Sequence, residues 1–224
     1  MNERRERRSG LIIGCALASI SFVLTAMLGI ADAKTPTVYY CNGLAATIVG
    51  NNWSDTINGT SGADVIVGLA GGDTINGNGG NDTICGNRDY DTIHGNAGND
   101  FIDGGSTGDV LHGDDGADDI WGGTGGETMY GDAGNDSMHG DDGGDVVMGG
   151  DGNDDIAGGL DQDSLYGGNG DDDVFSWDEL GLQLDDLNLD CGPDTTYDRA
   201  YINWYEQEIV SNCEYIFTDV NLSD

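Results

Sequence analysis

Aliphatic residues recur at every ninth position between Gly50 and Phe175, with no insertion over that stretch. With Gly50 as position one of a nine-residue unit, position eight is aliphatic in all fourteen units. Positions seven to nine alternate polar, aliphatic and polar, which is typical of a short half-buried strand. The position-eight residues are Ile57, Ile66, Ile75, Ile84, Ile93, Ile102, Leu111, Ile120, Met129, Met138, Val147, Ile156, Leu165 and Val174. A fixed short period of this kind indicates a solenoid.

Glycine occupies position one in every unit and position four in ten of the fourteen. Because glycine adopts positive φ easily, the first six residues are expected to form a tight turn. Two turn-and-strand units make one coil of eighteen residues, and successive coils stack about 4.8 Å apart with parallel strands. The expected fold class is therefore all-β: a parallel β-roll, or β-solenoid, in which the aliphatic columns of two sheets meet in a thin core.

Position six is acidic throughout, and stacking places the acidic residues of alternate units on neighbouring rungs. The first ladder is Asp64, Asp82, Asp100, Asp118, Asp136, Asp154 and Asp172; the second ladder is Asp55, Asp73, Asp91, Asp109, Glu127, Asp145 and Asp163. Like charges at that spacing repel unless cations lie between them. Ca²⁺ takes six to eight oxygens from carboxylates and turn carbonyls, whereas thiolate- or imidazole-preferring metals find few ligands here. Several Ca²⁺ ions are thus expected, held by all fourteen acidic residues and by the turn glycines Gly62, Gly80, Gly98, Gly116, Gly134, Gly152 and Gly170.

The two ladders differ in their turn residues. The first ladder has glycine at position four in every unit, while Trp53, Asp89, Thr107 and Asp161 replace that glycine in the second ladder, where Glu127 also replaces aspartate. Such segregation is consistent with an eighteen-residue coil. We expect the first ladder to hold calcium at nearly every gap, and the second to bind more weakly around units five, seven and thirteen.

The unit Gly149–Ala157 fits the pattern G-x-x-G-x-D-x-U-x, where U is aliphatic. This pattern resembles the repeat-in-toxin (RTX, hemolysin-type) calcium-binding nonapeptide. The resemblance covers a little over half of the chain and implies a parallel β-roll with calcium in its turns. Because one aliphatic residue per nine gives little apolar burial against the entropy of ordering the backbone, we expect the roll to be largely disordered without calcium and to fold as calcium binds.

Residues 1–33 have the features of a signal peptide. A basic segment, Arg4–Arg8, precedes the apolar run Leu11–Ile30, and Ala31–Ala33 matches an A-x-A cleavage site. Two alternatives are an uncleaved membrane anchor, since the run is long enough to span a bilayer, and a lipobox ending at Cys15. The expected location is secreted and extracellular, with attachment to the cell surface as a variant.

Two segments are expected to cap the roll of residues 50–175, because the end rungs of a solenoid need covering. These are an N-terminal cap, residues 34–49, and a C-terminal cap, residues 176–224, which is poorer in glycine and richer in leucine and aromatic residues. Beyond the signal segment, four cysteines allow three disulfide pairings. Locality favours Cys191–Cys213, which leaves Cys41–Cys85; free buried thiols are the alternative.

The charge excludes one class of partner. The chain has a formal net charge of −35, with few lysines and arginines to contact phosphates, so nucleic-acid binding is not expected. A literal G-x-S-x-G at Gly104–Gly108 lacks the strand-turn-helix context of a hydrolase nucleophile, and no H-E-x-x-H is present. The prediction is a monomeric, non-enzymatic, exported calcium-binding protein with an extracellular structural or interaction role.

Two other functions are kept as alternatives. One is a calcium-dependent adhesin or glycan-binding module with a cell-surface partner, which would use an outward stripe of position-nine residues: His94, His112, Tyr130, Met148 and Tyr166. Such a stripe offers aromatic stacking for a sugar or imidazole for a soft metal. The other is an enzyme with its site in the C-terminal cap.

Overall fold

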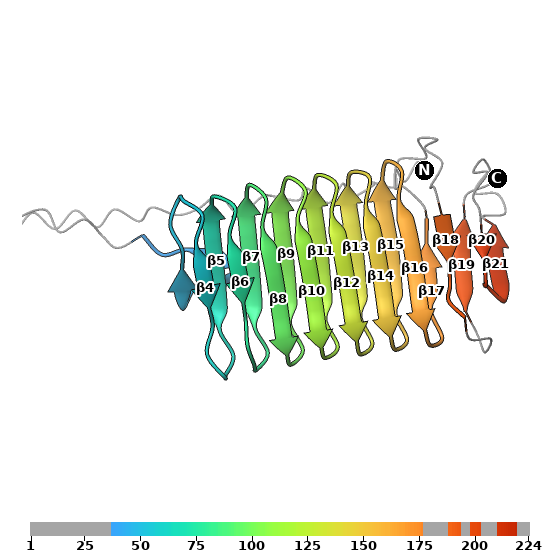
Figure 1. Cartoon of the computed structure of the whole chain (residues 1–224), viewed down its shortest axis with the longest axis horizontal. Coiled ribbons are helices and arrows are strands. Elements are labelled where there is room, and N and C mark those ends of the chain that lie inside the picture. Colours follow the sequence, from blue (N-terminus) through green and yellow to red (C-terminus); the bar gives the residue numbers. More distant parts are fainter. Residues whose placement is uncertain (1–36, 177–187, 194–197, 203–209, 219–224) are drawn as a thin grey trace, which may run out of the picture. The chain divides into compact units, whose positions relative to one another are not determined.

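The computed structural model describes residues 37–176, 188–193, 198–202 and 210–218, and these residues form strands and turns without a helix. Figure 1 shows the strands stacked side by side along the roll. A nine-stranded sheet contains β4 (Thr56–Asn58), β6 (Thr74–Asn76), β8 (Thr92–Ala97), β10 (Val110–Asp115), β12 (Thr128–Ala133), β14 (Val146–Asp151), β16 (Ser164–Asn169), β18 (Asn188–Asp190) and β20 (Val210–Ser211).

The second sheet has ten strands and takes the remaining elements of the roll. It contains β3 (Ile48–Val49), β5 (Val65–Ala70), β7 (Thr83–Arg88), β9 (Phe101–Ser106), β11 (Asp119–Thr124), β13 (Ser137–Asp142), β15 (Asp155–Leu160), β17 (Asp173–Phe175), β19 (Arg199–Ile202) and β21 (Tyr215–Thr218). Neighbours within each of these sheets are parallel, and consecutive strands alternate between the two sheets. The predicted parallel β-roll is confirmed.

The eighteen-residue coil is also confirmed. Through the repeats, each residue pairs with the one eighteen positions later, as Ile75 does with Ile93 and Leu111 with Met129. All of the predicted position-eight residues are buried in one continuous core, and from Ile66 to Val174 their exposed fraction is 0%.

The strands are longer than the sequence predicted. A typical strand such as β10 runs for six residues, from position seven through the position-one glycine to position three of the next unit. Positions eight and one are both buried, so aliphatic residues and glycines alternate on the core face. The expectation of positive φ at position one is therefore wrong; the backbone instead takes positive φ at position two, as at Asp114 and Asp132, and at position four.

Each end of the roll carries a disulfide. A small antiparallel hairpin, β1 (Tyr40–Cys41) with β2 (Leu44–Ala45), is tied to β7 by Cys41–Cys85, whose S–S distance is 2.03 Å. Cys191 and Cys213 are joined at 2.00 Å. The favoured pairing is thus confirmed, and within the expected N-terminal cap β3 pairs with β5.

The C-terminal region adds strands to both sheets. Leu189 pairs with Leu165, and Ala200 pairs with Val174, so the aliphatic columns continue past the last regular repeat. The boundaries of the two caps stay predictions. The signal peptide, residues 1–33, and its alternatives lie outside the described residues, and the part of the chain that is described contains no helix suited in length and apolarity to crossing a bilayer.

Candidate metal centre

The position-six carboxylates lie inside the roll, under its turns. Every one from Asp64 to Asp172 is buried, with an exposed fraction of 8% at Asp64 and no more than 3% at the others. Along each ladder, the backbone N–H of one aspartate donates to Oδ1 of the aspartate eighteen residues later, as from Asp100 to Asp118 at 2.7 Å and from Asp73 to Asp91 at 2.7 Å. The predicted stacking of carboxylates on neighbouring rungs is confirmed, and a backbone donor lies between the members of each pair except Asp109 and Glu127.

The position-one glycine makes room for the carboxylate of its own unit. A Cβ on Gly113 would lie 2.4 Å from Oδ2 of Asp118 and 2.9 Å from the carbonyl oxygen of Gly131 on the next rung. Glycine is needed here because the aspartate folds back over its Cα, and not because of its φ. One carboxylate oxygen thus lies against the core-facing backbone, while the other accepts the rung hydrogen bond.

The position-four glycines line up at the crest of the turns in the first ladder. A Cβ on Gly116 would lie 1.7 Å from the carbonyl oxygen of Gly98 and 3.1 Å from Oδ1 of Asp118. A carbonyl oxygen of one rung and a carboxylate oxygen of the next therefore border the same small space. The glycines whose carbonyl oxygens approach the next position-four glycine in this way are Gly80, Gly98, Gly116, Gly134 and Gly152. At the start of the ladder, a Cβ on Gly62 would have no atom within 4 Å.

Most of the buried carboxylates have an oxygen without a hydrogen bond. Oδ2 is buried and has no hydrogen-bond partner in Asp73, Asp82, Asp91, Asp100, Asp109, Asp118, Asp136, Asp145 and Asp154, and neither oxygen of Glu127 has one. A buried polar atom without a partner is costly and points to a missing ligand. The donor set consists of carboxylates and backbone carbonyls, and an oxygen-only set of this kind fits Ca²⁺. The residues of the turns therefore fit the ion that the sequence predicted.

Burial also raises the pKa of these carboxyl groups, because charge is poorly solvated inside the roll. The pKa rises to about 7 for Asp91, Asp109, Asp118 and Asp154 and to about 6 for Asp82 and Asp136. The rung hydrogen bond opposes this shift in each case without cancelling it. A cation in the turn would favour the charged form and remove the penalty.

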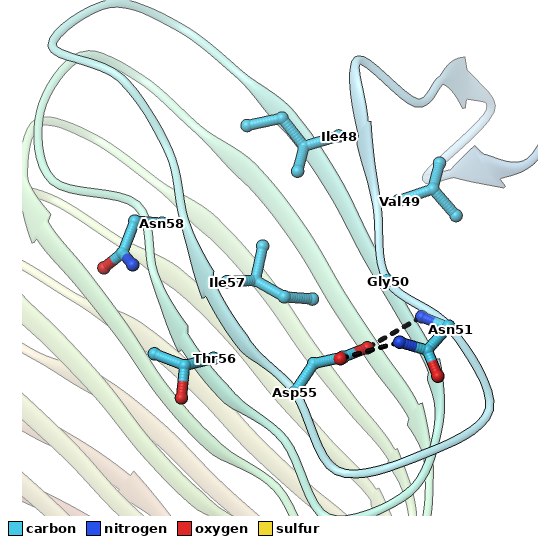
Figure 2. A pocket seen from close by; sticks show the side chains of 8 residues that line it. All are labelled: Ile48, Val49, Gly50, Asn51, Asp55, Thr56, Ile57 and Asn58. Atoms are coloured by element: carbon cyan, nitrogen blue, oxygen red, sulfur yellow. Dashed lines mark hydrogen bonds between the residues drawn. The ribbon is translucent and has the colours of Figure 1, made fainter.

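The N-terminal ends of the ladders differ from the middle. Asn51 donates from its backbone N–H to Oδ2 of Asp55 at 2.8 Å and from Nδ2 to Oδ1 at 2.7 Å, as Figure 2 shows. Hydrogen bonds from Thr60 to Asp64 lower the pKa of Asp64. At these two members, protein donors take up carboxylate oxygens, so they are the weakest candidates among the predicted ligands.

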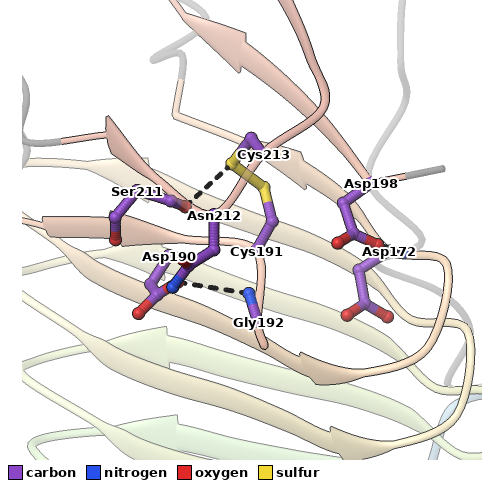
Figure 3. The surroundings of a disulfide bond; sticks show 8 residues. All are labelled: Asp172, Asp190, Cys191, Gly192, Asp198, Ser211, Asn212 and Cys213. Atoms are coloured by element: carbon purple, nitrogen blue, oxygen red, sulfur yellow. Dashed lines mark hydrogen bonds between the residues drawn. A yellow bond between two sulfur atoms is a disulfide. The ribbon is translucent and has the colours of Figure 1, made fainter. Parts of the chain in front are cut away.

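The C-terminal end of the first ladder includes one residue that the sequence reasoning missed. The backbone N–H of Asp172 donates to Oδ1 of Asp198 at 3.1 Å, and Asp198 is fully buried. Figure 3 shows the two carboxylates beside each other near the Cys191–Cys213 disulfide. The sequence does contain the local pattern of a rung here, because Asp198 is followed by Arg199 and Ala200 in the same acidic-x-aliphatic order as positions six to eight. The period of the repeat does not predict this rung, because Asp172 and Asp198 are 26 residues apart and not 18.

The repeats match one protein-family model along most of the roll. The family is described as RTX calcium-binding nonapeptide repeat (4 copies), and its matches cover residues 49–84, 58–93, 77–111, 94–126, 103–138, 121–156 and 148–178. Together they span more than half of the 224 residues. The chain belongs to the RTX calcium-binding nonapeptide repeat family. A comparison with curated proteins gives no match.

Within these RTX repeats, Glu127 marks the largest irregularity of the second ladder. Its two oxygens have no hydrogen-bond partner, so the rung bond that links Asp91 to Asp109 has no equivalent from Asp109 to Glu127. A Cβ on Gly125 would lie 2.4 Å from Oε1 of Glu127, which shows that the longer side chain reaches the crest of the turn. Burial and the neighbouring Asp145 raise the pKa of Glu127.

Proposed function

We propose that this RTX protein is exported and folds outside the cell as several Ca²⁺ ions bind in its turns, giving a rigid extracellular structural or interaction element. The observation that carries the proposal is the two ladders of buried carboxylates, in which every member from Asp73 to Asp154 has an oxygen without a hydrogen-bond partner. The ions would supply positive charge and oxygen coordination at those turns. No catalytic step is proposed.

The proposed ligands are the position-six carboxylates of both ladders and the crest carbonyls of the first. In the first ladder, Asp82 to Asp154 combine a buried unpartnered oxygen with a crest glycine on the same turn. In the second ladder, Asp73 to Asp145 keep the carboxylate, while Asp89 and Thr107 replace the crest glycine of two units. We therefore place the stronger calcium sites in the first ladder.

Export is supported by three features. Residues 1–33 have the composition of a signal peptide, and two disulfides are favoured by an oxidising compartment. The RTX calcium-binding repeats are the third, since extracellular calcium-binding modules of weak affinity are filled at the millimolar calcium found outside cells. A chain that stays unfolded until it meets calcium would also be competent for transport across a membrane.

A non-enzymatic role is supported by the surroundings of the one serine that matches a nucleophile motif. Ser106 ends strand β9, within a regular repeat, and its hydroxyl donates to the backbone carbonyl of Asn87 at 3.1 Å. A hydrolase nucleophile instead sits in a strained turn between a strand and a helix, next to a general base. Ser106 therefore has the position and hydrogen bonding of an ordinary repeat residue.

The test is to express the full chain in a host with an export pathway, recover it outside the cytoplasm and determine its N-terminus by mass spectrometry. Far-UV circular dichroism is then followed during a calcium titration of that material. The expected result is cleavage after Ala33 and a β signal that develops only as calcium is added. A complete β signal in calcium-free buffer would contradict coupled folding, and retention of the chain inside the cell would contradict export.

A further inference from the structure

A second kind of metal ligand lies on the outer face of the nine-stranded sheet. His94 in β8 and His112 in β10 are direct partners on neighbouring rungs, and their rings stack with centroids 4.4 Å apart and an interplanar angle of 12°. Asp114, two residues after His112, places Oδ2 3.0 Å from Nδ1 of His94. This group lies outside the buried carboxylate ladders, because its residues occupy positions nine and two of the repeat.

We infer that His94, His112 and Asp114 form a site for a nitrogen-preferring divalent transition metal such as Zn²⁺ or Cu²⁺. One ligand atom from each of the three residues lies within 4.8 Å of the other two. Zn²⁺ binds imidazole nitrogen and carboxylate oxygen at about 2.0–2.2 Å, so two donors 3.0 Å apart already suit adjacent positions around one ion. Because the stacked rings hold their nitrogen lone pairs in nearly parallel planes, the His112 ring has to turn out of the stack to direct a nitrogen at the same ion.

The site is accessible and held in place. The side chains of His94 and Asp114 are each 33% exposed, so an ion can reach them from solvent. His112 is oriented from the other side by Asp132, whose Oδ2 lies 3.0 Å from its Nδ1. A carboxylate bonded to the second ring nitrogen is a usual partner of a metal-binding histidine, because it fixes the ring and raises its basicity. The rigid register of the sheet keeps the two imidazoles on neighbouring rungs.

The chemistry separates this site from the calcium sites. Imidazole suits Zn²⁺ and Cu²⁺, while Ca²⁺ prefers oxygen donors alone. The strong negative charge of the chain, −35 in all, raises the local concentration of any divalent cation. Calcium and the transition metal are therefore expected to bind at the same time, at separate sites.

The stacking geometry also bears on the glycan-binding alternative. His112 stacks on Tyr130 as well, with centroids 4.4 Å apart and an interplanar angle of 6°. The faces of the His94, His112 and Tyr130 rings are thus turned toward one another along the stripe, and ring edges are turned to solvent. A sugar stacks on an aromatic face, whereas a metal binds at a ring edge. The arrangement of His94, His112 and Tyr130 therefore favours metal binding over sugar binding.

The third histidine provides a matched control. His139 also occupies position nine and also stacks on an aromatic ring, that of Trp121, with centroids 4.2 Å apart. It lies in β13 of the other sheet and its partners in register are Trp121 and Ala157, so it has no second imidazole beside it. A metal ion that needs two neighbouring imidazoles should therefore not bind at His139.

The test is a zinc titration by calorimetry of the full, calcium-saturated chain, repeated with His94→Phe, His112→Phe and His139→Phe. Phenylalanine keeps a ring for stacking and removes both nitrogens. We expect the wild-type chain and His139→Phe to bind one Zn²⁺ per chain without displacing calcium. His94→Phe and His112→Phe should each weaken that binding at least tenfold, and Asp132→Asn about tenfold. With Cu²⁺, electron paramagnetic resonance should show coupling to two nitrogens in the wild type and in His139→Phe, but not in His94→Phe or His112→Phe.

Two results would overturn the inference. One is zinc binding that is unchanged in the double variant His94→Phe/His112→Phe, which would place the ion elsewhere. The other is an absence of saturable zinc binding by the wild-type chain while its β signal is intact. Circular dichroism is recorded for every variant, so loss of folding is read separately from loss of zinc. The inference needs only the register of the sheet, so a failure of calcium-coupled folding would appear in the calcium titration and not in this one.

Discussion

The two ladders share one buried framework and differ at the crest of their turns. In both, a backbone N–H donates to the next carboxylate at similar distances, 2.7 Å for Asp82 to Asp100 and 2.8 Å for Asp91 to Asp109. At the crest, Gly116 and Gly134 of the first ladder have φ of 155° and 143°, while Thr107 of the second has φ of 82°. The carboxylate rung therefore does not depend on the crest residue, and any difference in calcium binding should come from the crest.

The largest effect is expected from alanine at the crest of the first ladder. A Cβ on Gly134 would lie 1.3 Å from the carbonyl oxygen of Gly116, so Gly134→Ala must displace the turn. We expect a loss of about 3 kcal/mol or more in the free energy of unfolding at saturating calcium. Thr107→Ala keeps the Cβ that the second ladder already accommodates, and should change stability by no more than about 0.5 kcal/mol. Urea unfolding of both variants measures the difference, and equal losses would show that the crests are alike.

The next effect concerns calcium itself. Asp118→Ala should reduce calcium stoichiometry or affinity more than Asp91→Ala, because the turn of Asp118 has a crest glycine and that of Asp91 has Asp89. A filled weak site contributes about 1.4 kcal/mol when calcium is tenfold above its Kd, so the loss should also appear in stability. Calorimetric titration with calcium measures both variants. Equal losses would count against stronger sites in the first ladder.

A third prediction concerns what the ladders have in common. The pKa of both Asp91 and Asp118 rises to about 7, mainly through burial. Because the folded state holds these protons more tightly than the unfolded chain, the calcium-free roll should lose stability as pH rises from about 4 to 7. In calcium-free buffer, the β signal should therefore be larger at pH 5 than at pH 8. Asp118→Asn and Asp91→Asn should reduce this pH dependence equally, since the rung is shared.

A pH-independent β signal in calcium-free buffer would show that the carboxyl groups do not titrate in this range. Unequal effects of the two asparagine variants would show that the rungs also differ between ladders.

The smallest effect is expected from repairing the second ladder. Glu127→Asp should restore the rung hydrogen bond from Asp109 that the longer side chain prevents, and a hydrogen bond of this kind contributes about 1 kcal/mol. Thermal unfolding at saturating calcium should show a higher midpoint than for the wild type. Asp145→Glu, the reverse change one rung further along, is the matched control and should lower it. A lower midpoint for Glu127→Asp would indicate that Glu127 binds an ion better than aspartate does.

The sequence by itself determined the coil, the core and the two ladders of this protein. A period of nine residues fixes which residues share a face, and the departures at Asp89, Thr107 and Glu127 fall in one ladder because the coil contains two units. Pairing over eighteen residues, as between Ile75 and Ile93, follows from that count.

Only the tertiary structure decided what lies between the rungs. The extra rung at Asp198 and the contact of Asp114 with His94 each depend on where a side chain points relative to the next coil. These contacts join residues that the period does not relate directly, at spacings of 26 and 20 residues. A local repeat specifies its own conformation, but contacts between coils arise only once the coils are stacked.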